Sequence, residues 1–281
     1  MNFHKAPHIY TGEVHLNVLD LNRSVQFYQE VIGFKVLKEA SNKVVLTADG
    51  KTPLLIIEQP ENVTPKEPQK SGLYHFALLL PNRADLGAII KHFIQQHIRI
   101  GASDHLVSEA LYLSDPDGNG IEIYTDRSPD FWSWDNGKVA MSTDPLDGES
   151  IIAESAGQNW DGLPAGTVMG HVHLHVANLL EAKTFYNALG FEVVSNYPQA
   201  LFMSNGKYHH HIGLNTWNGE GAARPTSGSV GLQSYTLIYP DKTTLNDAIG
   251  ELKALEVEIE LSGSGFVVED PSGNRINLRA A

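Results

Sequence analysis

The chain has 281 residues, no cysteine, and 20 basic against 33 acidic residues, which gives a formal net charge of −13. The length suggests about two domains, the lack of cysteine excludes disulfides and thiolate metal sites, and the negative charge argues against nucleic acid or an anionic membrane as the main partner. The apolar stretch at 73–80 is too short to span a bilayer, and the N-terminal residues carry no apolar signal core. We therefore expect a cytoplasmic protein.

Internal repeats organise the chain. Residues 13–34 resemble residues 171–191, and each segment predicts an alternating strand followed by a short amphipathic helix. Residues 72–90 resemble residues 231–249 in the same way. Two pairs of similar segments indicate four copies of one structural unit.

The ends of the second and fourth copies correspond as well. Residues 114–124 and 269–279 share an Asp-Pro-x-Gly-Asn core, which is typical of a hairpin turn with glycine at a position of positive φ. Each copy is therefore predicted to be a strand–helix–strand–strand–strand (βαβββ) unit. The four predicted units span residues 9–60, 72–126, 168–217 and 229–281.

These units divide the chain into two halves. Residues 1–126 hold the first pair of units and residues 168–281 hold the second pair. The segment 127–167 contains Pro, Gly, Ser and acidic residues without sustained periodicity, so we predict a connector. Three tryptophans are expected to anchor it: Trp132, Trp134 and Trp160.

This layout resembles the vicinal oxygen chelate superfamily, which includes glyoxalase I, bleomycin- and fosfomycin-resistance proteins and extradiol ring-cleaving dioxygenases. The resemblance covers nearly the whole chain apart from the connector. It implies an α+β fold in which four βαβββ units pair into two open half-barrels, with a metal ion in a concave face. The fold alone does not choose among these chemistries.

Period-2 alternation sorts the side chains of each unit's first strand onto two faces. In the third unit it places three histidines on one face: His171, His173 and His175. In the second unit it places Leu73, His75 and Ala77 opposite Tyr74, Phe76 and Leu78. A strand histidine is usually a hydrogen-bonded structural residue, and we expect that role for His15, His173 and His175. His75 is different, because it interrupts the most apolar stretch of the chain, where an unpartnered imidazole costs about 1–3 kcal/mol.

Metal-ligating side chains are unevenly distributed among the units. The second and third units supply His75, Glu122 on a last strand, and His171. The corresponding positions of the first and fourth units carry Glu13, Ser234 and Asn277. That second set suits a divalent metal poorly, since neutral Ser and Asn bind weakly. Two imidazoles and one carboxylate with open positions are the ligand set of non-haem Fe(II) oxygen chemistry, and Mn(II) suits the same ligands.

The resemblance to extradiol dioxygenases extends to individual positions. It implies that the metal ligands are His171, His75 and Glu122. Residues 104–122 nearly match the extradiol signature, in which His105, Tyr112, the Asp-Pro-x-Gly turn and Glu122 fall at the family's spacings. Ser103 departs from the small set usual at its position.

The same resemblance implies catalytic residues. Alignment of residues 205–215 places an acid–base histidine at His210, and we expect its neighbours His209 and His211, in the same strand, to point to the opposite face. Tyr112 and His105 are expected to donate hydrogen bonds to the substrate.

A complete ligand set requires the second unit to meet the third, which leaves the first to meet the fourth. We predict this nested pairing, within one chain or across a dimer, although the best-known members of the family pair the first unit with the second and the third with the fourth. The half-barrel formed by the first and fourth units is then metal-free.

The favoured function is an extradiol dioxygenase of aromatic hydrocarbon catabolism, which cleaves catechol or a substituted catechol with O₂ at a mononuclear non-haem Fe(II). The expected partners are a small aromatic diol and O₂, with neither nucleic acid nor membrane, and the chain could act as a homo-oligomer.

Two alternatives stay open. If the first and second units pair, Glu13, His75 and Glu122 converge, with Glu58 nearby, in a carboxylate-rich site that suits a glyoxalase-type isomerase or lyase with Zn or Ni. The other alternative is a metal-free small-molecule-binding protein of the resistance type.

Overall fold

A computed structural model describes residues 2–281 and contains the four predicted βαβββ units. The first unit consists of β1 (Tyr10–Asn17), α1 (Leu21–Phe27), β2 (Lys35–Glu39), β3 (Lys43–Thr47) and β4 (Leu55–Glu58), and α1 continues into a π-helical turn, Tyr28–Ile32. The second consists of β5 (Gly72–Leu79), α2 (Arg83–Gln95), β6 (Gly101–Asp104), β7 (Ser108–Ser114) and β8 (Gly120–Asp126).

The second half of the chain repeats this order. The third unit consists of β11 (Val168–His175), α4 (Leu179–Ala188), β12 (Glu192–Tyr197), β13 (Ala200–Ser204) and β14 (Ile212–Asn215). The fourth consists of β15 (Gly231–Tyr239), α5 (Lys242–Ala254), β16 (Glu260–Ser262), β17 (Gly265–Glu269) and β18 (Arg275–Ala280). Within residues 2–281, none of the helices has the length and apolar character needed to cross a membrane.

Each unit turns from its first strand into its helix at an Asp or Asn. The side chains of these four residues accept a hydrogen bond from a backbone N–H in the first helical turn, which satisfies a donor that the helix leaves free. The four N-caps are Asp20, Asn82, Asn178 and Asp241. The repeated cap explains why all four helices begin at equivalent points of the repeat.

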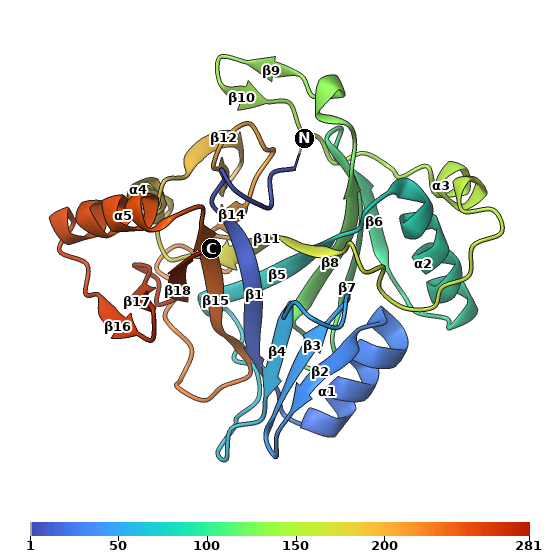
Figure 1. Ribbon diagram of the computed structural model, residues 1–281, viewed down its shortest axis with the longest axis horizontal. Helices are drawn as coiled ribbons and strands as arrows, with labels where there is room; N and C mark the ends of the chain where they lie inside the picture. The colour runs from blue at the N-terminus through green and yellow to red at the C-terminus, as the bar shows by residue number, and fades with distance from the viewer. Residues whose placement is uncertain (1) are drawn as a thin grey trace.

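The strands form two eight-stranded sheets, and each sheet combines one unit from each half of the chain. One has the order β12-β13-β14-β11-β5-β8-β7-β6 and joins the third unit to the second through antiparallel β11 and β5. The other has the order β16-β17-β18-β15-β1-β4-β3-β2 and joins the fourth unit to the first through antiparallel β15 and β1. The nested pairing is therefore confirmed within a single chain (Figure 1).

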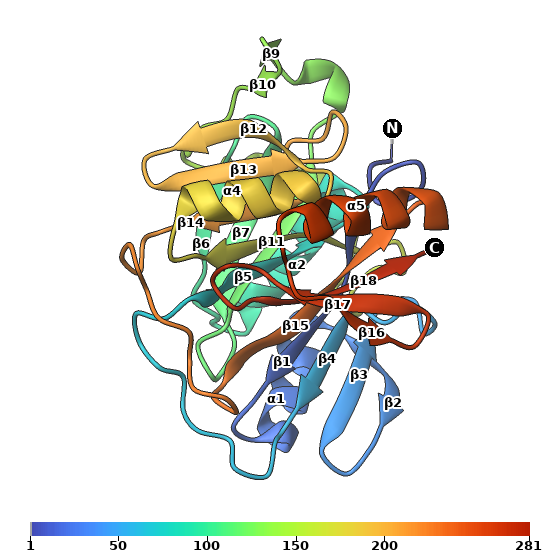
Figure 2. The ribbon, with the colours of Figure 1, turned by 90° about the vertical axis from the view of Figure 1, so that its left-hand side faces the viewer.

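The two units of each half of the chain still contact each other, although they do not share a sheet. Tyr28, which follows α1, donates a hydrogen bond of 2.8 Å to Asp115 in the turn before β8. Tyr186 of α4 makes the equivalent bond to Asp270, of 3.2 Å, in the turn before β18. In Figure 2, α4 lies next to α5 on one side of the sheets.

The connector has more regular structure than its sequence predicts. It forms a short hairpin of β9 (Trp134–Asp135) and β10 (Lys138–Val139), and a helix α3 (Gly148–Glu154) that packs on α2. A side chain at Gly87 of α2 would place its Cβ 2.3 Å from the carbonyl oxygen of Ile151, so glycine permits this close approach. A seven-residue helix gains its stability from such packing and not from its own periodicity.

The three tryptophans lie where an anchor is expected. Trp132 is buried in a small cluster with Phe3 and Tyr208, and Trp134 packs against the same cluster. Trp160 packs against the main apolar core. The connector is thereby held against the sheet of the second and third units (Figure 1).

Candidate metal centre and active site

The three predicted ligands meet near the centre of the sheet that joins the second and third units. His171 of β11 lies opposite Ala77 of β5, and Ala77 in turn lies opposite Glu122 of β8. The small side chain of Ala77 leaves room between the two larger ones. His75, two residues before Ala77, points to the same face, so the three polar side chains converge.

The distances within this cluster are short. Glu122 Oε2 lies 3.0 Å from His75 Nε2 and 3.1 Å from His171 Nε2. One potential ligand atom from each residue lies within 4.8 Å of the others, and all three side chains are buried. His75 Nε2 is buried without a hydrogen bond of acceptable geometry. A buried imidazole nitrogen of this kind beside a carboxylate suits the binding of a cation.

The charge states of the cluster also suit a metal. Burial lowers the pKa of His171, which favours the neutral imidazole that binds metals. Burial by itself raises the pKa of Glu122, but His171 and His75 outweigh it, so the pKa of this carboxyl lies well below its usual value. Two imidazoles and one carboxylate form a donor set for a divalent transition metal with open coordination positions.

A pocket of about 340 Å³ opens above the cluster. Five of the six predicted site residues line it: His75, His105, Tyr112, Glu122 and His210. The sixth, His171, lies directly beneath and is completely buried. The volume is in the range of small-molecule sites. A larger cleft of about 870 Å³ lies between the loops 59–72 and 217–231, but it does not contain the three clustered residues.

His105 and Tyr112 form a hydrogen-bonded pair at the pocket wall. His105 Nδ1 lies 2.6 Å from the carbonyl oxygen of Ser142, which can only accept, so the proton of a neutral His105 is on Nδ1. His105 Nε2 then accepts a hydrogen bond of 2.6 Å from the Tyr112 hydroxyl. Burial and the nearby Glu122 raise the pKa of Tyr112 well above its usual value, so the phenol stays protonated.

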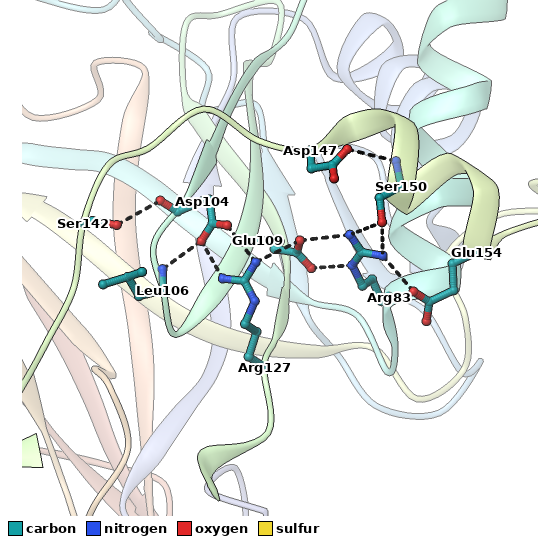
Figure 3. Close-up of polar contacts among 9 residues, drawn as sticks. All are labelled: Arg83, Asp104, Leu106, Glu109, Arg127, Ser142, Asp147, Ser150 and Glu154. Atoms are coloured by element: carbon teal, nitrogen blue, oxygen red, sulfur yellow. Dashed lines mark hydrogen bonds and ion pairs between the residues drawn. The ribbon is translucent and has the colours of Figure 1, made fainter. Parts of the chain in front are cut away.

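A chain of ion pairs fixes the wall that carries His105. Figure 3 shows Arg127 between Asp104, which accepts its hydrogen bonds, and Glu109, with which it forms an ion pair. Arg83 binds the same glutamate at 2.7 Å and continues to Glu154 of α3 at 2.8 Å. This series of ion pairs holds the connector against the second unit and thereby positions the Ser142 carbonyl that orients His105.

His210 occupies the opposite wall of the pocket. It precedes β14 in a loop, and its ring centroid lies 4.1 Å from that of His171. Burial, with a smaller contribution from His171, lowers the pKa of His210 well below its usual value. His209 and His211 are fully buried and do not line the pocket.

The predicted strand through residues 209–211 is wrong. The ladder of β14 begins at Ile212, and the three histidines lie in the loop before it. His209 and His211 do point away from the pocket, but loop geometry directs them and not strand alternation. His211 instead bonds the carbonyl oxygen of Phe3 at 3.1 Å.

The predicted faces of β5 are also wrong at one end. A β-bulge lies at Tyr74, because His75 pairs with His173 while Leu73 pairs with the next residue, Leu174. The bulge moves Tyr74 into the pocket and returns Leu73 to the apolar core. Alternation alone gives the opposite assignment for these two residues.

Several pocket residues were missed by sequence reasoning. His173, for which we expected a structural role, lines the pocket. The strand alternation that placed it on the face of His171 was the available signal. Trp217, Tyr197 and Phe202 add aromatic walls, and their sequence positions carry no distinguishing pattern.

The alternative site of the first and second units does not form. Glu13 lies in the other sheet, where it accepts a hydrogen bond from Thr236 and pairs with Arg279 at 2.6 Å. Glu58 pairs with His15 and Lys43 in that same sheet. These carboxylates are therefore separated from His75 and Glu122 by the division into two sheets.

Comparisons with known proteins agree with the fold. The family model described as "Glyoxalase/Bleomycin resistance protein/Dioxygenase superfamily" matches residues 8–123 and 168–278. A protein of Bacillus subtilis (strain 168) named "Catechol-2,3-dioxygenase" is 46% identical over 275 residues, which cover 96% of each chain.

Two solved structures support the same architecture. Glyoxalase I from Zea mays is 15% identical, with a TM-score of 0.56 over 96% of this chain and 92% of that one. The cppA protein from Streptococcus pneumoniae TIGR4 is 12% identical, with a TM-score of 0.60 over all of both chains. At these identities the likeness concerns the fold, and it confirms the predicted vicinal oxygen chelate architecture. The chain belongs to the Glyoxalase/Bleomycin resistance protein/Dioxygenase superfamily and is an enzyme of its dioxygenase type.

Proposed function

We propose that this enzyme is an extradiol dioxygenase that opens the ring of catechol, or of a substituted catechol, with O₂ at one Fe(II) ion. The observation that carries the proposal is the buried group of His75, His171 and Glu122 beneath an aromatic pocket. The name of the 46% identical relative supplies the substrate class.

Three protein ligands leave coordination positions free for small molecules. His75, His171 and Glu122 would hold Fe(II), which would supply binding positions for a catechol and O₂ and would lower the pKa of a bound hydroxyl. The carboxylate of Glu122 partly neutralises the ion, and the two neutral imidazoles complete the ligand set without adding charge.

Tyr112 contacts the substrate oxygens from one side. His105 does not donate to the substrate as the sequence led us to expect, because its Nδ1 is held by the Ser142 carbonyl and its Nε2 accepts from Tyr112. The Tyr112 oxygen accepts a hydrogen bond from a catechol hydroxyl while its own proton points to His105. Once that substrate oxygen has lost its proton, the Tyr112 hydroxyl rotates and donates to it. His105 cannot turn away during this exchange, because the Ser142 carbonyl holds its Nδ1.

His210 acts from the other side as the acid–base residue. Its ring is neutral, faces the pocket, and lies next to the ring of His171. A neutral imidazole accepts a proton from the diol and later returns it to an oxygen of the opening ring. Tyr74, Phe202 and Trp217 enclose a flat apolar ring between them and exclude water from it.

The decisive experiment is anaerobic reconstitution of the purified protein with Fe²⁺, followed by an oxygen-electrode assay with catechol. We expect about one iron per chain, O₂ uptake that depends on catechol, and a yellow ring-opened product. Reconstitution with Mn²⁺ in parallel identifies the metal that supports turnover.

Two results would contradict the proposal. Iron binding without catechol-dependent O₂ uptake would refute the reaction. Failure to retain any divalent metal, together with tight binding of an aromatic ligand, would favour a metal-free binding protein.

A further inference from the structure

Behind the proposed acid–base residue, two buried side chains form a hydrogen-bonded row. His210 Nδ1 lies 2.8 Å from His209 Nδ1, and His209 Nε2 lies 2.8 Å from Asp126 Oδ1. Asp126 ends strand β8, the strand that also carries Glu122. Of the three residues only His210 lines the pocket.

The chemistry of these atoms determines where the protons lie. A carboxylate only accepts hydrogen bonds, so His209 must carry a proton on Nε2. A neutral His209 then has a bare Nδ1, which accepts the proton carried by His210 Nδ1. Nε2 of His210 is consequently left without a proton on the side that faces the pocket.

The surroundings leave His209 little freedom to rearrange. Its ring is completely buried, with the ring of Tyr208 4.1 Å away and that of Trp132 5.3 Å away between centroids. The N-terminal segment covers this cluster, because Phe3 packs on Trp132 and His4 on Tyr208. Water cannot easily replace the partners that select each proton position.

We propose that Asp126 and His209 are positioning residues that hold the proton of His210 on Nδ1 and keep its Nε2 free to accept a proton in the pocket. This inference rests on the proposed dioxygenase function. It also implies that Trp132 of the connector and the N-terminal segment shield the row from solvent.

The chain offers a matched control. His211 follows His210 directly and is as deeply buried as His209, but it bonds the Phe3 carbonyl and does not touch the row. Replacing each of the two histidines by Phe therefore distinguishes the effect of losing a buried imidazole from the effect of breaking the row.

The test combines kinetics with the proton position in the metal-free protein. The variants are Asp126→Leu, His209→Phe, the control His211→Phe, and Asp126→Glu, which restores a carboxylate. Nitrogen NMR of ¹⁵N-histidine-labelled metal-free protein, assigned by the signals lost in His210→Phe, reports which ring nitrogen of His210 is protonated. The iron content of each reconstituted variant and its kcat and KM for catechol are measured alongside.

We expect wild-type His210 to be protonated on Nδ1, and Asp126→Leu and His209→Phe to lose this preference. In both variants kcat should fall about 10–100-fold with full iron content and nearly unchanged KM. Asp126→Glu should recover much of the kcat, and His211→Phe should keep both kcat and the proton position.

The inference is overturned if wild-type His210 carries its proton on Nε2, if Asp126→Leu and His209→Phe leave kcat unchanged, or if His211→Phe loses as much as His209→Phe. Absence of O₂ uptake in the wild-type protein would refute the proposed function, whereas the NMR result would still decide the proton position.

Discussion

The two half-barrels have the same strand order but opposite chemistry at equivalent positions. Where one carries His171, His75 and Glu122, the other carries Glu13, Ser234 and Asn277. In the second group, Asn277 donates a 3.2 Å hydrogen bond to Ser234. Arg279 pairs with Glu13, so the carboxylate already has a permanent cation.

This contrast indicates why the proposed metal site lies in one half-barrel and not in the other. Among residues 2–281, Glu122 forms ion pairs with His75 and His171. Both of these imidazoles can themselves bind a metal when they are neutral. Glu13 is instead paired with Arg279, and Glu58 is paired with Lys43 as well as with His15. The charged Arg279 and Lys43 cannot bind a metal. A metal at that place would have to displace these cations. Fold duplication therefore supplies two equivalent sheet faces, and we expect the counter-groups of the carboxylates to decide which of them binds a metal.

The largest effect is expected from His171→Ala. It removes one of three ligands, so the reconstituted protein should hold no stoichiometric iron and show no measurable O₂ uptake. His15→Ala, which removes a strand histidine of the other half-barrel, is the control and should retain both. Metal analysis after gel filtration decides, and full iron content in His171→Ala would show that the metal lies elsewhere.

A large effect on turnover alone is expected from His210→Phe. The ring shape is kept but the proton acceptor is lost, so kcat should fall about 10²–10⁴-fold while iron content stays at the wild-type level. Steady-state O₂ uptake and metal analysis on the same preparation provide the check. An unchanged kcat would remove His210 from the reaction.

The repeats in the sequence explain why so much of the architecture could be predicted. Four similar segments fixed the unit boundaries, and the uneven distribution of ligands such as His75 and Glu122 required the nested pairing that the sheets display. Turns also followed from local chemistry: Gly118 and Gly273 both have positive φ, at 81° and 86°, as the Asp-Pro-x-Gly-Asn motif demands.

The missed features depend on contacts between distant segments. The bulge at Tyr74 reverses a face, but it arises from the pairing of β5 with β11 and leaves no trace in the alternation. The run His209–His211 lies in a loop because Asp126 and the carbonyl of Phe3 bind its imidazoles. Helix α3 exists because it packs on α2. None of these partners is adjacent in the sequence.

A moderate loss of stability is expected at acid pH, and it concerns the half-barrel that is rich in buried histidine. Burial lowers the pKa of His4 to about 4, so the unfolded chain binds a proton between about pH 6.5 and 4 that the folded protein does not bind. Stability of the metal-free protein should therefore fall as the pH falls through this window. The His4 side chain is partly buried, so His4 alone accounts for at most about 3 kcal/mol at pH 4.

Urea unfolding of the metal-free protein at steps from pH 7 to pH 4 measures this loss. In His4→Gln the difference between the unfolding free energies at pH 7 and pH 4 should be smaller than in the wild-type protein by about the His4 contribution. Each protein is compared with itself at pH 7 and pH 4, so a loss of stability that the variant already shows at pH 7 does not affect the result. An unchanged pH dependence in His4→Gln would mean that His4 is not buried as a neutral ring.

The smallest effect is expected from Glu13→Gln in the other half-barrel. The variant breaks the pair with Arg279, whose side chain is 45% exposed, and pairs of this kind contribute about 0–1 kcal/mol. Iron content, kcat and KM for catechol should all match the wild-type protein, because Glu13 lies in the other sheet from Glu122. A glyoxalase-type site that used Glu13 would lose its metal in this variant. Loss of iron on this single substitution would therefore reverse the assignment of the two half-barrels, whereas retention confines the metal to the histidine-rich one.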